Sequence, residues 1–273
     1  MSYIRVNSTN LYYEEIGEGE PIILLNGIFM STKSWSPISN MLAKKYRVIL
    51  HDFRGQWGSE KPKGKYTFGM HAEDLHGLLK ELDLEKVHLI GTSYGGEVAM
   101  DFSIKYKEMV KSLSIISSVS EIKLRLKLTS ERWKNAAETK NSEVFIKEWL
   151  GDTYSESFLE TNFDLLYPRL IEALKSFDFD AAERLIDCFL TLYDQPLTGE
   201  LHKIASPTLI VAAELDTLKP PPYSEIIKGE IKNSEFHVVM NAGHAVVIEK
   251  PNEINTLLAG FIGKIQNLEA NNN

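Results

Sequence analysis

Short runs of apolar residues alternate along the chain with longer segments in which apolar residues recur at helical spacing. The runs predict strands at residues 22–25, 48–50, 87–90, 113–116, 208–212 and 236–240. Residues 71–82 and 97–106 predict helices, and two alternating segments at 3–6 and 11–15 predict an antiparallel pair. Because near-continuous apolar strands must be covered on both faces, the pattern predicts an α/β fold with a mostly parallel central sheet flanked by helices.

Residues 120–197 interrupt this alternation, because they contain helical stripes and no clear strand. We predict a helical lid here, inserted into a core domain that comprises residues 1–119 and 198–273. The segment is rich in aromatic residues, including Phe145 and Trp149, which favours a lid that lines an apolar pocket over the sheet edge where α/β folds bind ligands. An ordinary helical extension packed on the side of the sheet is the alternative.

Ser93 lies at the centre of the sequence Gly91-Thr92-Ser93-Tyr94-Gly95, directly after an apolar strand. This G-x-S-x-G pattern is typical of a sharp strand-to-helix turn that exposes a serine hydroxyl above the sheet. Such a turn needs small residues two positions before and two positions after the serine, and glycine occupies both, at Gly91 and Gly95. The pattern predicts a nucleophile, although Ser93 as a simple helix cap is the alternative.

A serine needs a nearby base, and the base needs an acid to orient it. His244 follows the predicted strand at 236–240, so it opens on the same sheet edge as Ser93; His51 is the second choice. Asp216 follows the strand at 208–212, with Glu214 and Glu121 as competitors for the acid. The chain order serine, acid, histidine is the order of α/β-hydrolases.

Composition and charge exclude several other classes of protein. The formal net charge of −8 argues against binding to nucleic acid or to an anionic membrane surface. A single cysteine, Cys188, excludes an intramolecular disulfide and a cysteine-rich metal site, and His71 and His76 would diverge on a helix. We therefore expect no metal ion and no cofactor. The N-terminal residues show no signal peptide, so we expect a cytoplasmic protein.

Taken nearly end to end, the sequence resembles a lid-bearing, serine esterase-like member of the α/β-hydrolase superfamily. The resemblance rests on residues 17–27, 51–55, the serine turn, 214–216 and 243–251. It implies Ser93 as nucleophile, His244 as base and Asp216 as acid. It also implies an oxyanion hole formed by the backbone N–H groups of Ile28 and Tyr94, with Phe29 as the alternative to Ile28.

Two departures from the family pattern bear on the site. Asn26-Gly27 stands where the family usually has His-Gly, and we expect the asparagine to support the oxyanion loop by a different set of hydrogen bonds. Trp57 stands at the second glycine of the R-G-x-G-x-S pattern, so it either projects toward the pocket or packs beneath it. The predicted pocket residues are Phe29, Trp57, Phe145, Trp149 and Ala245.

These features predict a carboxylesterase that cleaves a small, largely apolar ester through an acyl-enzyme intermediate. A lactonase, a thioesterase and a carbon–carbon bond hydrolase would use the same triad, so these alternatives stay open. A non-catalytic receptor for a small apolar molecule is the alternative from another class. A pure interaction module is a third, supported only by the lid surface.

Overall fold

The computed structural model describes residues 2–270 and contains an eight-stranded sheet in the order β1-β2-β4-β3-β5-β6-β7-β8. The strands are β1 (Ser2–Val6), β2 (Thr9–Ile16), β3 (Glu20–Leu25), β4 (Tyr46–His51), β5 (Val87–Thr92), β6 (Val110–Ile116), β7 (Thr208–Ala213) and β8 (Ser234–Val239). β1 pairs with β2 and β2 with β4 in antiparallel fashion, and every other pairing is parallel. The predicted fold class is confirmed.

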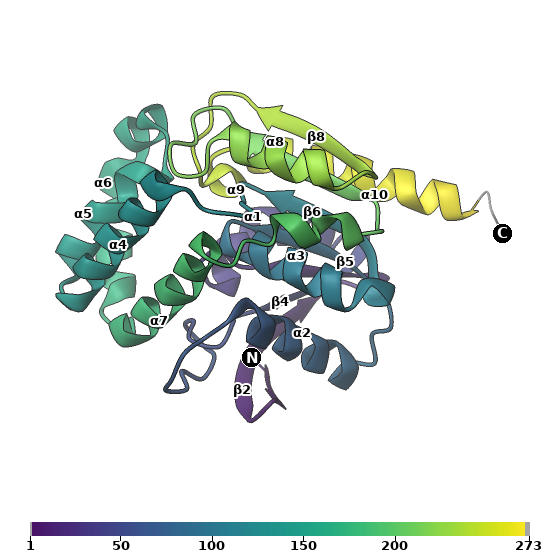
Figure 1. Ribbon diagram of the computed structural model, residues 1–273, viewed down its shortest axis with the longest axis horizontal. Helices are drawn as coiled ribbons and strands as arrows, with labels where there is room; N and C mark the ends of the chain where they lie inside the picture. The colour runs from purple at the N-terminus through teal and green to yellow at the C-terminus, as the bar shows by residue number, and fades with distance from the viewer. Residues whose placement is uncertain (1, 271–273) are drawn as a thin grey trace.

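Helices cover both faces of the sheet (Figure 1). One face carries α1 (Ser36–Leu42), α9 (Val246–Glu249) and α10 (Pro251–Ala270); the other carries α2 (Phe68–Glu81), α3 (Tyr94–Lys105) and α8 (Pro221–Glu230). Alternate residues of β3 enter the two cores, since Ile22 packs on the first face and Ile23 on the second. This two-sided burial explains why the central strands are continuous apolar runs.

Four α-helices lie between β6 and β7 and project beyond the end of the sheet, at the left of Figure 1. We call them the helical insertion: α4 (Leu124–Glu138), α5 (Ser142–Thr153), α6 (Glu156–Leu174) and α7 (Phe179–Leu190). The chain leaves and rejoins the core at one point, where the Leu197 N–H donates to the Ser120 carbonyl at 2.7 Å. The Ser120 and Thr198 hydroxyls are 2.8 Å apart.

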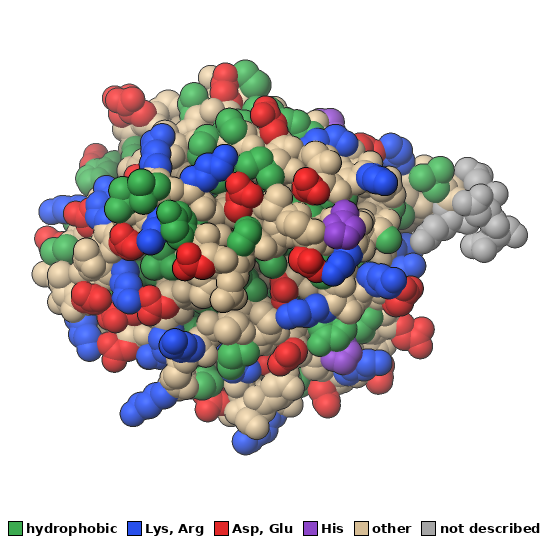
Figure 2. Space-filling view, in the orientation of Figure 1, with side chains coloured by type: hydrophobic (Ala, Val, Ile, Leu, Met, Phe, Trp, Pro, Cys, Tyr) green, Lys and Arg blue, Asp and Glu red, His purple; other side chains and the backbone are tan. Residues whose placement is uncertain are grey.

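The face seen in Figure 2 mixes acidic and basic side chains without a large region of one sign. Within residues 2–270, no helix combines the length and the apolar character that a membrane span requires. The charge distribution on this face gives no sign of a dedicated electrostatic binding surface.

Candidate active site

Ser93 occupies a sharp turn between β5 and α3. Its backbone adopts φ 51° and ψ −121°, a conformation that non-glycine residues rarely take and that costs of order 1–3 kcal/mol. Ser93 is the N-cap residue of α3, but its side chain makes no capping hydrogen bond with the helix. The hydroxyl is therefore directed away from the helix and is available for another partner.

The glycines of the turn are required by close backbone contacts. A Cβ atom on Gly91 would overlap the carbonyl oxygen of Gly95, and one on Gly95 would overlap the carbonyl oxygen of Leu25. A Cβ on Gly96 would collide with the Ser118 side chain. The small residues thus let α3 start against the ends of β3 and β6, which supports the strained conformation of Ser93.

Three side chains from separate loops meet at the sheet edge. The Ser93 Oγ atom is 2.8 Å from His244 Nε2, and His244 Nδ1 is 2.8 Å from Asp216 Oδ2. The other carboxylate oxygen of Asp216 accepts hydrogen bonds from the backbone N–H groups of Leu218 at 2.9 Å and Lys219 at 2.7 Å. A carboxylate only accepts hydrogen bonds, so this arrangement favours a proton on Nδ1 and leaves Nε2 free to accept a hydrogen bond from the Ser93 hydroxyl.

The competing candidates lie outside this hydrogen-bonded chain. His51 is fully buried in β4 next to the Asp52 carbonyl, and burial lowers its pKa to about 4. Glu214 is exposed and accepts the Asn241 N–H, whereas Glu121 accepts the Thr198 hydroxyl. The geometry therefore favours His244 over His51 and Asp216 over both glutamates.

Two cavities reach Ser93. The narrow cavity, about 20 Å³, is lined by Ser93, Ile28 and Tyr94 together with residues of the helical insertion, and it has room for a single water-sized group. The wide cavity, about 130 Å³, is lined by Ser93, His244 and mainly apolar side chains. Ser93 and Ile28 line both cavities, whereas of the other two residues Tyr94 lines the narrow cavity and His244 lines the wide one.

The loop that carries Ile28 is held by a buried amide network. The Asn26 amide donates to Asp52 Oδ1 at 3.0 Å and to Gln56 Oε1 at 3.2 Å, and its oxygen accepts from Trp35 Nε1 at 2.9 Å. Gln56 Nε2 in turn donates to the carbonyl oxygens of Gly27 at 2.8 Å and Ile28 at 3.0 Å. The asparagine therefore acts on the loop mostly through Gln56, a residue that the sequence analysis did not single out.

Of the five predicted pocket residues, Phe29, Trp149 and Ala245 line the wide cavity. The other two, Trp57 and Phe145, line neither cavity that reaches Ser93, and for Trp57 this agrees with the second of its two predicted positions, beneath the pocket. Trp57 packs on Phe177 and donates to the Phe29 carbonyl at 2.9 Å, and Phe145 is fully buried against Phe29 and Phe177. Neither lines the cavity, since both support Phe29 from behind.

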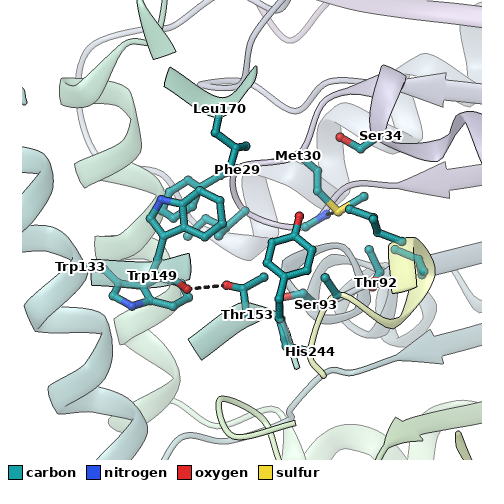
Figure 3. A pocket seen from close by; sticks show the side chains of 16 residues that line it. Phe29, Met30, Ser34, Thr92, Ser93, Trp133, Trp149, Thr153, Leu170 and His244 are labelled. Atoms are coloured by element: carbon teal, nitrogen blue, oxygen red, sulfur yellow. Dashed lines mark hydrogen bonds between the residues drawn. The ribbon is translucent and has the colours of Figure 1, made fainter. Parts of the chain in front are cut away.

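Trp133 and Met30 line the wide cavity and were not predicted (Figure 3). The rings of Trp133, Trp149 and Phe29 gather on one side of it, while Ser93 and His244 lie on the other. Trp133 is anchored by a 2.8 Å hydrogen bond from Nε1 to Asp152, which leaves its ring to form the wall. The aromatic content of residues 120–197 was the signal that could have identified Trp133.

A strained serine turn follows a central strand of the sheet, and an acid and a histidine lie on later loops at the same edge. This arrangement defines a fold of the hydrolase type. Residues 20–251 match the sequence model of the family described as the alpha/beta hydrolase fold, and the chain belongs to this family.

Individual relatives are similar to this protein over nearly the whole length of the chain. A proline iminopeptidase, PfmaB, of Pestalotiopsis fici is 28% identical, over 92% of this chain and 95% of its own length. The crystal structure of MGS-M2, an alpha/beta hydrolase enzyme from a Medee basin deep-sea metagenome library, is 29% identical with a TM-score of 0.91, covering 96% of this chain and 97% of that one. A thermophilic esterase from Thermogutta terrifontis is 25% identical with a TM-score of 0.83, covering 97% and 99%.

Proposed function

We propose that this protein is a serine hydrolase that cleaves small, uncharged carboxylic esters through an acyl-enzyme intermediate. The observation that carries the proposal is the continuous hydrogen-bonded chain from Ser93 through His244 to Asp216, which opens on an apolar cavity. The esterase from Thermogutta terrifontis, which has the same fold, adds support.

In the first half-reaction, the Ser93 oxygen attacks the ester carbonyl carbon while His244 Nε2 takes the hydroxyl proton. The tetrahedral intermediate collapses, the bond to the alkoxide breaks, and His244 returns the proton to the leaving alcohol. In the second half-reaction, His244 takes a proton from water while the water oxygen attacks the acyl carbon, and the bond to the Ser93 oxygen then breaks as His244 returns the proton to that oxygen and the carboxylic acid leaves. Asp216 stabilises the imidazolium that forms in each half.

The negative charge on the carbonyl oxygen would develop in the narrow cavity. The backbone N–H groups of Ile28 and Tyr94 are the proposed donors to it, and Ser93 lines the same cavity. The acyl chain and the leaving group would share the wide cavity, which His244 borders. His244 would then border the cavity from which the alcohol departs, which supports its proposed role as proton donor.

The wide cavity favours a small and neutral substrate. Among its lining residues there is no aspartate, glutamate, lysine or arginine, so a charged substrate group would be buried without a partner. Its volume of about 130 Å³ is similar to the ~150 Å³ of an apolar cavity that holds benzene. Lactones and thioesters present the same carbonyl to Ser93, so a substrate panel must separate them from open-chain esters.

The test is the hydrolysis of p-nitrophenyl esters from acetyl to octanoyl by the wild type and by Ser93→Ala. We expect turnover that is greatest for short acyl groups and a loss of at least ~1000-fold in the variant. Ser103→Ala is the matched control, because Ser103 lies on α3, is buried and bonds only its own helix through the Ala99 carbonyl. Equal rates for the wild type and Ser93→Ala would reject the proposal and favour a ligand-binding protein.

A further inference from the structure

A buried ion pair joins the acid loop to the helix that follows the serine turn. Lys219 Nζ lies 3.0 Å from both carboxylate oxygens of Glu97, and the two side chains are 3% and 0% exposed. The residues are 122 positions apart in the sequence. The lysine ammonium also lies 4.5 Å from the centre of the Phe189 ring on α7, so it contacts the helical insertion as well.

Each end of the pair is connected to a residue of the hydrogen-bonded chain. The Lys219 backbone N–H donates to Asp216 Oδ1 at 2.7 Å, so the lysine and the acid share one short loop. Glu97 lies in the first turn of α3, four residues after Ser93, and its Oε1 accepts the Val119 N–H at 2.8 Å. The pair therefore links the Asp216 loop to the Ser93 turn by a path that does not pass through His244.

Stability alone does not explain a charged pair at this place. Burial lowers the pKa of Lys219 and raises the pKa of Glu97, because removing either charge from water is costly. Buried ion pairs are often replaced by apolar residues without loss of stability. The other ionisable groups around the pair are Asp216 and His244 on neighbouring loops, Tyr94 on α3 and Cys188 on α7.

We propose that Lys219 and Glu97 are positioning residues that fix the Asp216 loop relative to Ser93, so that His244 bridges the two at hydrogen-bonding distance. The proposal rests on the hydrolase function proposed above. Lys219 also lines the narrow cavity with Ser93, Ile28 and Tyr94, so the lysine end of the pair borders the space where the oxyanion would form. Loss of the pair would misplace the acid and would slow the chemical step.

The experiment compares Glu97→Gln, Lys219→Met and the double variant with the wild type. Each single variant leaves one buried charge without its partner, so we expect a lower Tm in both. The double variant removes both charges, and its Tm should lie above that of either single variant. If the pair positions Asp216, kcat stays about 10- to 100-fold below the wild type even in the double variant, with KM nearly unchanged.

The matched control is Asp74→Asn. Asp74 lies on α2 and forms a buried ion pair with Arg54, in which Arg54 Nη2 is 2.7 Å from Asp74 Oδ1. This substitution should lower the Tm without lowering kcat. A double variant with both Tm and kcat restored would show that Lys219 and Glu97 serve stability only, and would overturn the proposal. If Lys219→Met does not fold, the near-isosteric Glu97→Gln provides the test. A lower kcat with a nearly unchanged KM would support the proposal, and an unchanged kcat would overturn it.

A spectroscopic measurement separates this proposal from the proposed function. The Nδ1 proton of His244, bonded to Asp216, should give a low-field NMR signal in the wild type and in Asp74→Asn. The signal should move or disappear in Glu97→Gln and in the double variant. A changed signal in these variants of a protein without esterase activity would support the positioning role and reject the proposed function. An unchanged signal in variants of a protein with esterase activity would support the proposed function and reject the positioning role.

Discussion

The support of the oxyanion loop by Gln56 leads to a quantitative prediction for Gln56→Leu. The change removes four hydrogen bonds made by a buried side chain, at distances from 2.8 to 3.2 Å. Asn26 keeps its bond to Asp52, and the Gly27 carbonyl still accepts from the Met30 N–H. The Ile28 carbonyl and the Phe53 N–H lose this partner.

Leaving the buried Phe53 N–H and the partly buried Ile28 carbonyl without a partner costs roughly 1–3 kcal/mol each, so the free energy of unfolding should fall by roughly 2–6 kcal/mol. At about 2–4 °C of Tm per kcal/mol, this is a decrease of at least ~4 °C. Deleting one oxyanion donor outright lowers kcat by about 10²–10³-fold. Because Gln56→Leu displaces the Ile28 donor without removing it, we expect a kcat loss of about 10- to 100-fold.

The assay measures kcat and KM with p-nitrophenyl acetate well below the Tm of each variant. Asn255→Leu is the matched control, because Asn255 is a buried amide that donates to the Pro37 carbonyl at 3.1 Å, outside the two cavities that reach Ser93. It should change the Tm but not kcat. Equal kcat losses in the two variants would refute the reasoning that Gln56 acts on the oxyanion loop.

Two further predictions concern stability. Gly95→Ala should prevent stable folding, because its Cβ would overlap a neighbouring backbone, whereas Gly263→Ala on α10 meets nothing within 4 Å and should stabilise the protein by up to ~1 kcal/mol; equal Tm values would contradict this. Burial lowers the pKa of His51 to about 4, so between about pH 6.5 and 4 the His51 side chain is protonated in the unfolded chain but neutral in the folded protein. Denaturant titrations should therefore show that the free energy of unfolding of the wild type falls by up to ~1.4 kcal/mol for each pH unit by which the pH is lowered across this window, relative to His51→Gln. Above the window the two proteins should have the same pH dependence. Parallel profiles throughout would contradict the pKa assigned to His51.

The fold and the three meeting loops could be predicted because each signal is local. The strand before Ser93, the strands before Asp216 and His244, and the glycines of the turn are each visible within a few residues. Parallel strands then bring their carboxyl ends to one edge without further information. Long-range knowledge was not needed to bring these side chains together.

The errors and omissions concern contacts between distant segments. Phe145 and Trp149 are both predicted to line the pocket, but only Trp149 reaches the cavity, because Phe29 and Phe177 enclose Phe145. No local pattern reveals that Lys219 pairs with Glu97 or that Gln56 holds the loop at Ile28. Such pairings depend on how the loops pack, which the order of residues does not display.

The closure of the helical insertion at Ser120 and Thr198 has an evolutionary consequence. Because the segment departs and returns through one narrow neck, it can be exchanged for another sequence of different length without altering any strand of the sheet. Trp133 and Trp149, which shape one wall of the wide cavity, would travel with it, whereas Ser93 would stay. An exchanged segment would change the wall of the wide cavity, but it would also have to replace the insertion's contacts at the narrow cavity and the Thr153 carbonyl that accepts from the Ala245 N–H.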